Sequence, residues 1–198
     1  WTAKQKREIW VSRVERTRSF CESLVSLPNP PSVLLAASAT GFYADSSVTE
    51  ISSEDAPRGE GFLAELAAAW EEACRPAIEA GIRVVHLRFG IVLSPRGGAL
   101  RAMLPVFRSG MGGSIGKGKQ FWSWVSLDDA VGAMHHALME SDIRGPLNVV
   151  APQPVTNAQF TEKLARAVRR WAPLPLPSSM AKILFGEMAD AMLCSSIR

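Results

Sequence analysis

The chain has 198 residues, of which 47% are hydrophobic and 21% charged, a composition typical of a globular domain with a sizeable core. Its formal net charge of +3 is spread along the chain, apart from small clusters at residues 4–7 and 166–170. No aromatic-and-basic groove motif accompanies these charges, so we expect no nucleic-acid partner.

Neither a membrane segment nor a metal site is indicated. No apolar run approaches the roughly 20 residues of a membrane span, and the N-terminus lacks the apolar block of a secretory signal. The three cysteines are widely separated and in no metal-ligand spacing, which favours packed thiols. We therefore predict a cytoplasmic protein with no membrane partner and no metal; the sequence does not indicate an oligomeric state.

The first half of the chain predicts a βαβ unit behind an N-terminal helix. Apolar residues recur at spacings of three and four over residues 3–25, as on an amphipathic helix. The short apolar run 32–37 is typical of a strand buried on both faces of a parallel sheet. A second helix over 62–80 and a second buried strand over 83–87 complete the unit, so the fold class is α/β.

The second half is less regular and predicts a lobe that faces a substrate. We expect a hairpin-like glycine-rich stretch over 110–118, in which residues 110–116 form a flexible substrate loop. Capping boxes are predicted to begin two helices at Ser126 and Thr156. The other predicted elements are a helix over 100–107, an aromatic strand over 121–125, a short strand over 147–150 and a last helix over 180–192.

An ordered series of short motifs runs through the chain: Ser38-Ala-Thr-Gly-Phe-Tyr43, Leu87-Arg88-Phe89-Gly90, Gly116-Lys-Gly-Lys-Gln120, Val125-Ser-Leu-Asp-Asp129 and Gly145-Pro-Leu-Asn148. The series resembles the extended short-chain dehydrogenase/reductase superfamily. Ser12-Arg13-Val14, Trp70-Glu71 and Gly186-Glu187-Met188 are similar to its atypical epimerase-like branch, also labelled cell-division-inhibitor-like.

The resemblance implies a Rossmann-like, doubly wound parallel sheet with a small C-terminal substrate lobe. Residues 1–95 would form the C-terminal portion of the dinucleotide-binding domain. Residues 96–198 would form the lobe, with returning Rossmann elements at about 121–150. The N-terminal strand and glycine-rich turn of the family, which cradle the pyrophosphate, are expected to lie outside this sequence.

The resemblance also implies a nicotinamide cofactor, NADP(H) in the first place and NAD(H) as the alternative, with a small-molecule substrate. Cofactor contacts are then expected from the N-terminal helix and from the ends of the two buried strands. The residues that we assign to this role are Arg13, Ala37, Ser38, Gly90, Ile91 and Val92. For Arg13, a solvated surface arginine is the alternative.

The proton relay of the superfamily, a tyrosine followed four residues later by a lysine, is missing. Phe62 and Leu66 occupy those two positions. Ser38 matches the catalytic serine, and Tyr43 is the one tyrosine in the chain, so these two are the catalytic candidates for reduction, oxidation or epimerisation of a small carbonyl or alcohol compound. Capping of the strand end is the alternative for Ser38, and a catalytically inactive nucleotide-binding sensor or scaffold is the alternative for the protein.

Two further assignments concern the lobe and a charged pair. Trp122 and Trp124 stand where nucleotide-sugar enzymes of the superfamily carry an arginine, which favours an apolar or aromatic ligand surface, with ordinary strand packing as the alternative. We expect Arg88 to form a structural ion pair with Asp129, with a catalytic role as the alternative.

Overall fold

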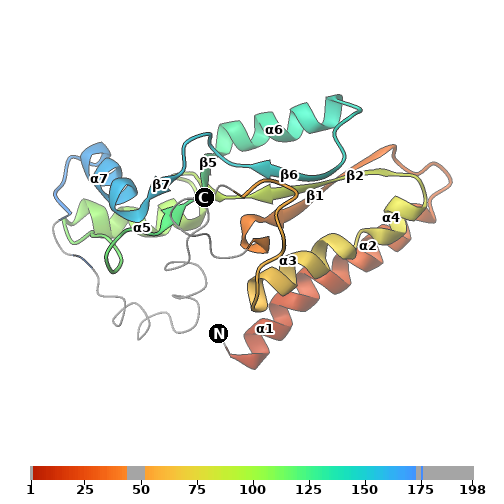
Figure 1. The fold of residues 1–198 in the computed structure, drawn as a ribbon, viewed down its shortest axis with the longest axis horizontal. Helices are drawn as coiled ribbons and strands as arrows, with labels where there is room; N and C mark the ends of the chain where they lie inside the picture. The colour runs from red at the N-terminus through yellow and green to blue at the C-terminus, as the bar shows by residue number, and fades with distance from the viewer. Residues whose placement is uncertain (1, 44–51, 173–174, 176–198) are drawn as a thin grey trace. The chain divides into compact units, whose positions relative to one another are not determined.

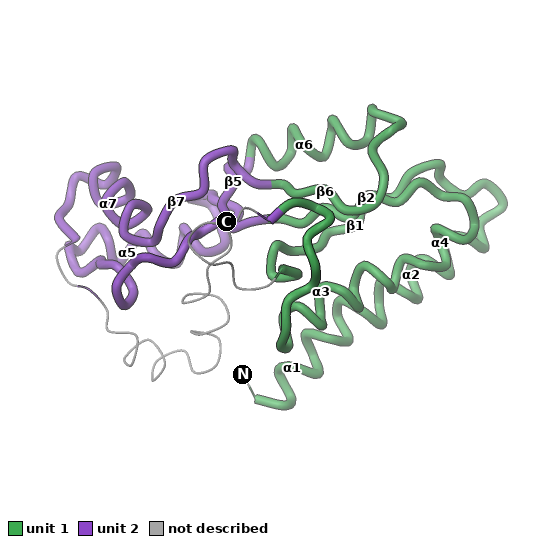
Figure 2. The backbone as a smooth tube through the Cα atoms, viewed as in Figure 1, with its two compact units in different colours: residues 1–44, 53–89, 128–149 green, residues 45–52, 90–127, 150–198 purple. Residues whose placement is uncertain are grey.

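Residues 2–43, 52–172 and 175 are described by a computed structural model of the chain. They belong to two compact units that interleave along the sequence (Figure 2). The first unit holds residues 1–44, 53–89 and 128–149, and the second holds 45–52, 90–127 and 150–198. The domain division near residue 95 stays a prediction. Among the described residues, no helix has the length and apolar character needed to cross a bilayer.

A parallel sheet forms the centre of the first unit. Its strands are β1 (Val33–Ala39), β2 (Arg83–Phe89) and β6 (Gly145–Val149), in the order β1-β2-β6. Both strand pairs are parallel. The apolar runs of β1 and β2 suit a sheet covered on both faces, and they confirm the predicted α/β class.

Helices from the first half of the chain lie along one face of this sheet (Figure 1). The predicted N-terminal helix consists of α1 (Ala3–Trp10) and α2 (Arg16–Val25), joined without a break by a π-helical turn at Val11–Glu15. The predicted second helix is divided into α3 (Phe62–Glu72) and α4 (Arg75–Glu79), and Pro76 lies in the first turn of α4. Proline fits there because the first amides of a helix have no intrahelical partner.

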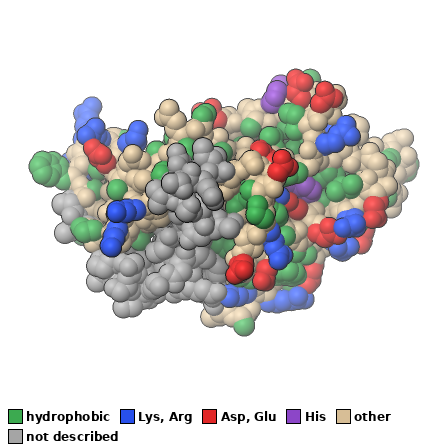
Figure 3. Space-filling view, viewed as in Figure 1, with side chains coloured by type: hydrophobic (Ala, Val, Ile, Leu, Met, Phe, Trp, Pro, Cys, Tyr) green, Lys and Arg blue, Asp and Glu red, His purple; other side chains and the backbone are tan. Residues whose placement is uncertain are grey.

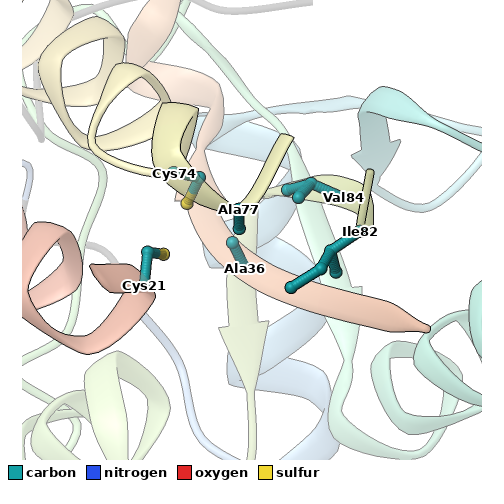
Figure 4. Packing of buried hydrophobic residues seen from close by; sticks show 6 residues of the cluster. All are labelled: Cys21, Ala36, Cys74, Ala77, Ile82 and Val84. Carbon is teal, nitrogen blue, oxygen red and sulfur yellow. The ribbon is translucent and has the colours of Figure 1, made fainter. Parts of the chain in front are cut away.

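Small side chains allow these helices to approach the sheet closely. The core between them contains Cys21 of α2, Ala36 of β1, Cys74 and Ala77 near α4, and the pair Ile82 and Val84 (Figure 4). Both cysteines are free and fully buried, and burial raises the pKa of Cys74 to about 12. They are therefore packed, protonated thiols, as predicted.

Helix α6 (Leu127–Met139) lies on the other face of the sheet (Figure 1). The buried side of the helix carries Ala130 and Ala137. The guanidinium of Arg83 donates to the carbonyls of Ala137 at 2.9 Å, Leu138 at 3.0 Å and Ile143 at 2.8 Å. A cation on the last carbonyls compensates the negative end of the helix dipole, so Arg83 fixes the end of α6 to β2.

The second unit contains two small strand pairs and two helices. β3 (Ile91–Leu93) pairs in parallel with β5 (Trp124–Ser126), and β4 (Phe121–Trp122) pairs antiparallel with β7 (Val155–Thr156). The predicted single strand over 121–125 is thus divided at Ser123 between two sheets. The helices are α5 (Gly98–Arg108) and α7 (Asn157–Ala167).

Helix α7 begins with the predicted capping box. The hydroxyl of Thr156 accepts from the amide of Gln159, and the Gln159 side chain accepts from the amide of Thr156. The helix predicted over 180–192 lies outside the described residues.

Candidate functional site

Three polar residues lie side by side near the carboxyl ends of the parallel strands. Ser38 of β1 is the register partner of Arg88 of β2, and Arg88 is the partner of Asn148 of β6. Ligands of α/β proteins bind outside this edge of the sheet. The row of side chains therefore belongs to the region in which a nucleotide site is expected.

Arg88 is the centre of the row and is only 3% exposed. Its guanidinium forms a two-pronged ion pair with Glu71 of α3, in which Nε and Nη2 each donate to a carboxylate oxygen at 2.8 Å. The predicted pairing with Asp129 was wrong, because the structure shows Arg88 paired with Glu71. Burial opposes ionisation of Glu71, but hydrogen bonds from Arg88 and Ser38 outweigh it, and the pKa of this carboxyl is lowered.

Tyr43 extends the network from Arg88 to β6. Its hydroxyl accepts from Nη1 of Arg88 at 2.8 Å and donates to Oδ1 of Asn148 at 2.7 Å. The ring of Phe42 lies against the guanidinium, with its centroid 3.7 Å from Cζ. Tyr43 is 5% exposed, so its hydroxyl is an internal group of the first unit.

Glu54 completes the network from the segment before α3. Its carbonyl accepts from Arg88 at 3.1 Å, and its carboxylate accepts from the backbone amide of Asn148 at 2.9 Å. No pattern in the sequence pointed to Glu54, and Glu71 entered only as part of a family motif. Both were missed because their partners are distant in the chain.

The Arg88–Glu71 ion pair therefore connects the catalytic candidates, because Ser38 bonds to Glu71 and Tyr43 bonds to Arg88. The Ser38 hydroxyl donates to Glu71 at 2.6 Å, and the side chain is 4% exposed. Both hydroxyls have strong internal partners, as expected for groups that hold strand ends together. Their catalytic roles stay predictions.

His86 lies two residues before Arg88 on the same face of β2 and is 7% exposed. Within the described part of the chain, its Nδ1 has no hydrogen-bond partner. Burial lowers the pKa of His86, against an opposing effect of the Glu71 carboxylate. The imidazole is thus a neutral group next to a charged pair.

Two cations of the N-terminal helix lie against aromatic rings of α3. Arg13, in the π-helical turn, lies 5.4 Å from the Trp70 ring and donates to the hydroxyl of Ser12 at 3.1 Å. Lys6 lies 5.2 Å from the ring of Phe62, the residue at the family's tyrosine position. These contacts join the two helices, and the cofactor role of Arg13 stays a prediction.

The remaining cofactor candidates lie at the ends of strands. Ala37 is exposed, although its neighbours Ala36 and Ser38 on β1 are buried. Gly90 follows β2 directly, and a Cβ there would lie 2.7 Å from the carbonyl oxygen of Ser123. Ile91 and Val92 are half-buried residues of β3. The close approach of the Gly90 backbone to Ser123 explains why glycine occupies position 90. The contacts of these residues with a cofactor stay predictions.

The two tryptophans of the lobe differ in environment. Trp122 is 4% exposed, its ring packs on Phe160 of α7 at 5.1 Å, and its Nε1 has no partner among the described residues. Trp124 is half-buried and donates to the carbonyl of Gln153 at 3.2 Å. Trp122 thus packs inside the lobe, as in the alternative of ordinary strand packing. Contact with a substrate stays a prediction for both tryptophans.

The second part of the glycine-rich stretch is fixed to the start of α7. The Asn157 side chain, 1% exposed, accepts from the amide of Ile115 at 2.7 Å. The amides of Asn157 and Ala158 donate to the carbonyls of Gln120 at 2.9 Å and Gly118 at 3.0 Å. We predicted a flexible loop here, and the structure shows a turn with several internal bonds.

Comparisons with known proteins identify relatives over nearly the whole chain. No protein-family model matches it. The chain is 42% identical over 190 residues to the epimerase family protein Mb2239 of Mycobacterium bovis, which covers 96% of this chain and 62% of that protein. It is 37% identical to the human epimerase family protein SDR39U1, over 98% of this chain and 66% of that protein.

The fold agrees with these relatives. A crystal structure of human SDR39U1 with NADPH matches 100% of this chain and 66% of the human chain, with a TM-score of 0.93 at 35% identity. The chain thus spans about two thirds of the length of these relatives. The match confirms the Rossmann-like sheet and the resemblance in the motifs, and the chain belongs to the epimerase family of the atypical extended short-chain dehydrogenase/reductase type.

Proposed function

We propose that the protein binds a nicotinamide dinucleotide, NADP(H) in preference to NAD(H), and acts as an epimerase or oxidoreductase on a small carbonyl or alcohol compound. One observation carries the proposal: the fold matches, with a TM-score of 0.93, a relative that was crystallised with NADPH. The parallel strands with polar carboxyl ends agree with it.

The cofactor contacts are proposed at the ends of β1 and β2. Ala37 offers an exposed small side chain between buried neighbours, so a flat ring could approach the backbone there. Gly90, Ile91 and Val92 follow β2 directly in the chain, and Arg13 would contribute a positive charge from the N-terminal helix.

A bound nicotinamide would supply or accept a hydride at the substrate carbon, and residues of this chain would handle the proton of the substrate oxygen. Ser38 would orient that oxygen and Tyr43 would supply the proton, once substrate replaced Glu71 or Asn148 as a hydrogen-bond partner. The buried thiols and the small-molecule substrate are compatible with a reducing cytoplasmic location, which we propose as well.

A second candidate function is a nucleotide-binding sensor or scaffold without turnover. It is favoured by the internal hydrogen bonds of Ser38 and Tyr43 and by hydrocarbon at the two relay positions, Phe62 and Leu66. Both functions share the bound cofactor and differ only in the chemical step.

Fluorescence titration of the chain with NADPH, beside full-length human SDR39U1 as a positive reference, tests cofactor binding. Ala37→Glu adds bulk and negative charge at the exposed position and should weaken NADPH binding at least about tenfold, which is ~1.4 kcal/mol. Ala3→Glu, in the exposed first turn of α1, is the matched control and should leave binding unchanged. Equal affinities for both variants would place the cofactor elsewhere.

The chemical step is tested by NADPH oxidation with a panel of ketones, aldehydes and quinones. Substrate-dependent oxidation that disappears in Tyr43→Phe supports the enzyme. Tight NADPH binding without oxidation by any member of the panel supports the sensor.

A further inference from the structure

Two of the three cysteines of the chain lie together in the core of the first unit, although they are far apart in the sequence. Cys21 is in the middle of α2, and Cys74 lies in the break between α3 and α4. In Figure 4 the Cys74 sulfur points toward the Cys21 sulfur. Two thiols are thus neighbours at an interface between helices.

The other members of this buried cluster are hydrocarbon side chains: Ala36, Ala77, Ile82 and Val84. In the part of the chain that the structure describes, no group of three or more His, Cys, Asp and Glu side chains could hold a metal ion. The chemistry open to the cluster is therefore that of two adjacent thiols.

Regular backbone holds both cysteines in place. The Cys74 carbonyl accepts from the amides of Ala77 at 3.0 Å and Ile78 at 3.2 Å, and the Cys74 amide donates to the carbonyl of Glu71 at 3.1 Å. Cys21 lies inside the continuous helix α2. The folded state keeps the two sulfurs close, which favours reaction between them over reaction with separate molecules.

The two thiols differ in how readily they ionise. Burial raises the pKa of both thiols, that of Cys74 to about 12. The Cys74 side chain lowers the pKa of the Cys21 thiol, whereas Cys21 raises the pKa of Cys74 further. Because the thiolate is the nucleophile, Cys21 is the sulfur expected to attack an oxidant and Cys74 is the sulfur that follows.

The outer faces of these helices are charged. Arg18 and Glu22 of α2 are exposed, as are Glu72 and Arg75 on the two sides of the α3–α4 break. Figure 3 shows acidic and basic side chains intermingled over these helices. Both thiols are fully buried beneath them, so an oxidant reaches the sulfurs only during a local opening of the helix interface. Oxidation should therefore be slower than at an exposed cysteine.

We propose that Cys21 and Cys74 are a redox-active pair, which hydrogen peroxide converts into a disulfide between α2 and the start of α4. The first sulfur attacks one oxygen of the peroxide, so that a sulfenic acid forms and one water leaves. The second sulfur displaces the sulfenic oxygen as a second water, and the S–S bond forms. Two electrons pass from the sulfurs to the peroxide, and the two thiol protons leave in the water molecules.

Peptide mapping of the oxidised native chain tests which sulfurs pair. The reduced chain is treated with hydrogen peroxide and digested without reductant. We expect a crosslinked peptide that joins Cys21 to Cys74, and an intact mass lower by two hydrogen atoms. The chain unfolded in urea is the control and should also form links to Cys194, which lies outside the described residues. The same mixture of links from both samples, or sulfinic acid without a disulfide, would overturn the proposal.

Three single variants show which thiols are required. Cys21→Ala and Cys74→Ala should each abolish the disulfide, and Cys194→Ala, the matched control, should form it at the native rate. In Cys74→Ala the sulfenic acid of Cys21 has no partner, so dimedone should trap it. An undiminished disulfide yield in Cys21→Ala or Cys74→Ala would contradict the pair. Peptide mapping of the native chain gives its answer even where a variant does not fold.

Thermal unfolding of the oxidised and reduced native chain tests whether the packed geometry suits the crosslink. A disulfide lowers the entropy of the unfolded chain, so the oxidised form should unfold at a temperature at least about 4 °C higher. Dithiothreitol should restore the lower midpoint. An equal or lower midpoint for the oxidised form would show that the fold does not hold these sulfurs ready to pair, and would overturn the inference. Neither NADPH nor a substrate takes part, so the outcome is independent of the proposed function.

Discussion

The guanidinium of Arg88 donates to the phenol oxygen of Tyr43 at 2.8 Å and at the same time forms a two-pronged ion pair with Glu71. One buried cation thus links β2 to α3 and to the residue that follows the 3₁₀ turn after β1. The guanidinium has few donors left for a ligand, so its first role is to hold these elements together.

Breaking the ion pair should destabilise the protein strongly. Glu71→Leu leaves the Arg88 charge buried without its carboxylate, and we expect a loss of about 3–5 kcal/mol in the free energy of unfolding. The double variant Glu71→Leu/Arg88→Met removes both charges and should recover part of this loss. Urea denaturation measures both, and a single variant as stable as the native chain would contradict a structural role for the pair.

Tyr43→Phe separates structure from catalysis. The change keeps the ring and removes the bonds to Arg88 and Asn148, so it should cost about 1–3 kcal/mol of stability without unfolding the protein. If Tyr43 only positions the strand ends, any substrate-dependent rate should fall in step with the folded fraction. If Tyr43 donates a proton, the rate should fall by 10² or more in fully folded protein.

Two groups should make the stability depend on pH, and the loss due to each begins at a different pH. The folded state keeps His86 neutral because burial lowers its pKa, so below the ordinary value of 6.5 the unfolded chain takes up the proton first and stability falls. Glu71 has a lowered pKa in the fold, so its contribution is present above 4.5 and is lost as the pH falls further.

His86→Leu identifies the loss of stability that is due to His86. The variant should remove the loss of stability that begins near pH 6.5, whereas His135→Gln, an exposed control on α6, should leave it. Thermal unfolding between pH 4 and 8 measures both curves. Identical slopes for the native chain and His86→Leu above pH 5 would show that His86 does not titrate as inferred.

The fold could be predicted from sequence where local pattern decides it. Continuous apolar runs gave β1 and β2, and the capping box at Thr156 placed the start of α7. The division of the strand at 121–125 could not be predicted, because alternation of aromatic residues does not reveal that Trp122 and Trp124 pair with different strands.

The site was predicted only in part, for a related reason. Ser38 and Tyr43 stood out by residue type at the end of a strand, but Glu54 and Glu71 acquire their roles through partners 94 and 17 residues away. A charged residue on a predicted helix is usually solvated, so nothing local marked Glu71 as the partner of a buried arginine.

Asn157 should control the order of the glycine-rich turn over residues 115–118. Asn157→Ala removes the acceptor for the Ile115 amide and should cost about 1–3 kcal/mol. Hydrogen exchange should become faster at residues 115–118 and stay unchanged in α5. Ser109→Ala, which removes an exposed hydroxyl bond to the Val106 carbonyl, is the control and should change neither. Unchanged hydrogen exchange at the Ile115 amide in Asn157→Ala would contradict the inference that the Asn157 side chain orders this turn.

Two glycines should respond in opposite directions to the same substitution. A Cβ at Gly90 would meet the Ser123 carbonyl oxygen at 2.7 Å, so Gly90→Ala must displace β3 from β5 and should cost about 1–3 kcal/mol. A Cβ at Gly132, in the middle of α6, meets nothing within 4 Å, so Gly132→Ala should stabilise the protein by about 0.5–1 kcal/mol through helix propensity. Thermal and urea unfolding measure both changes. If Gly90→Ala were neutral, the close approach of its backbone to Ser123 would not constrain this position, and a requirement for glycine there would have to come from the proposed cofactor.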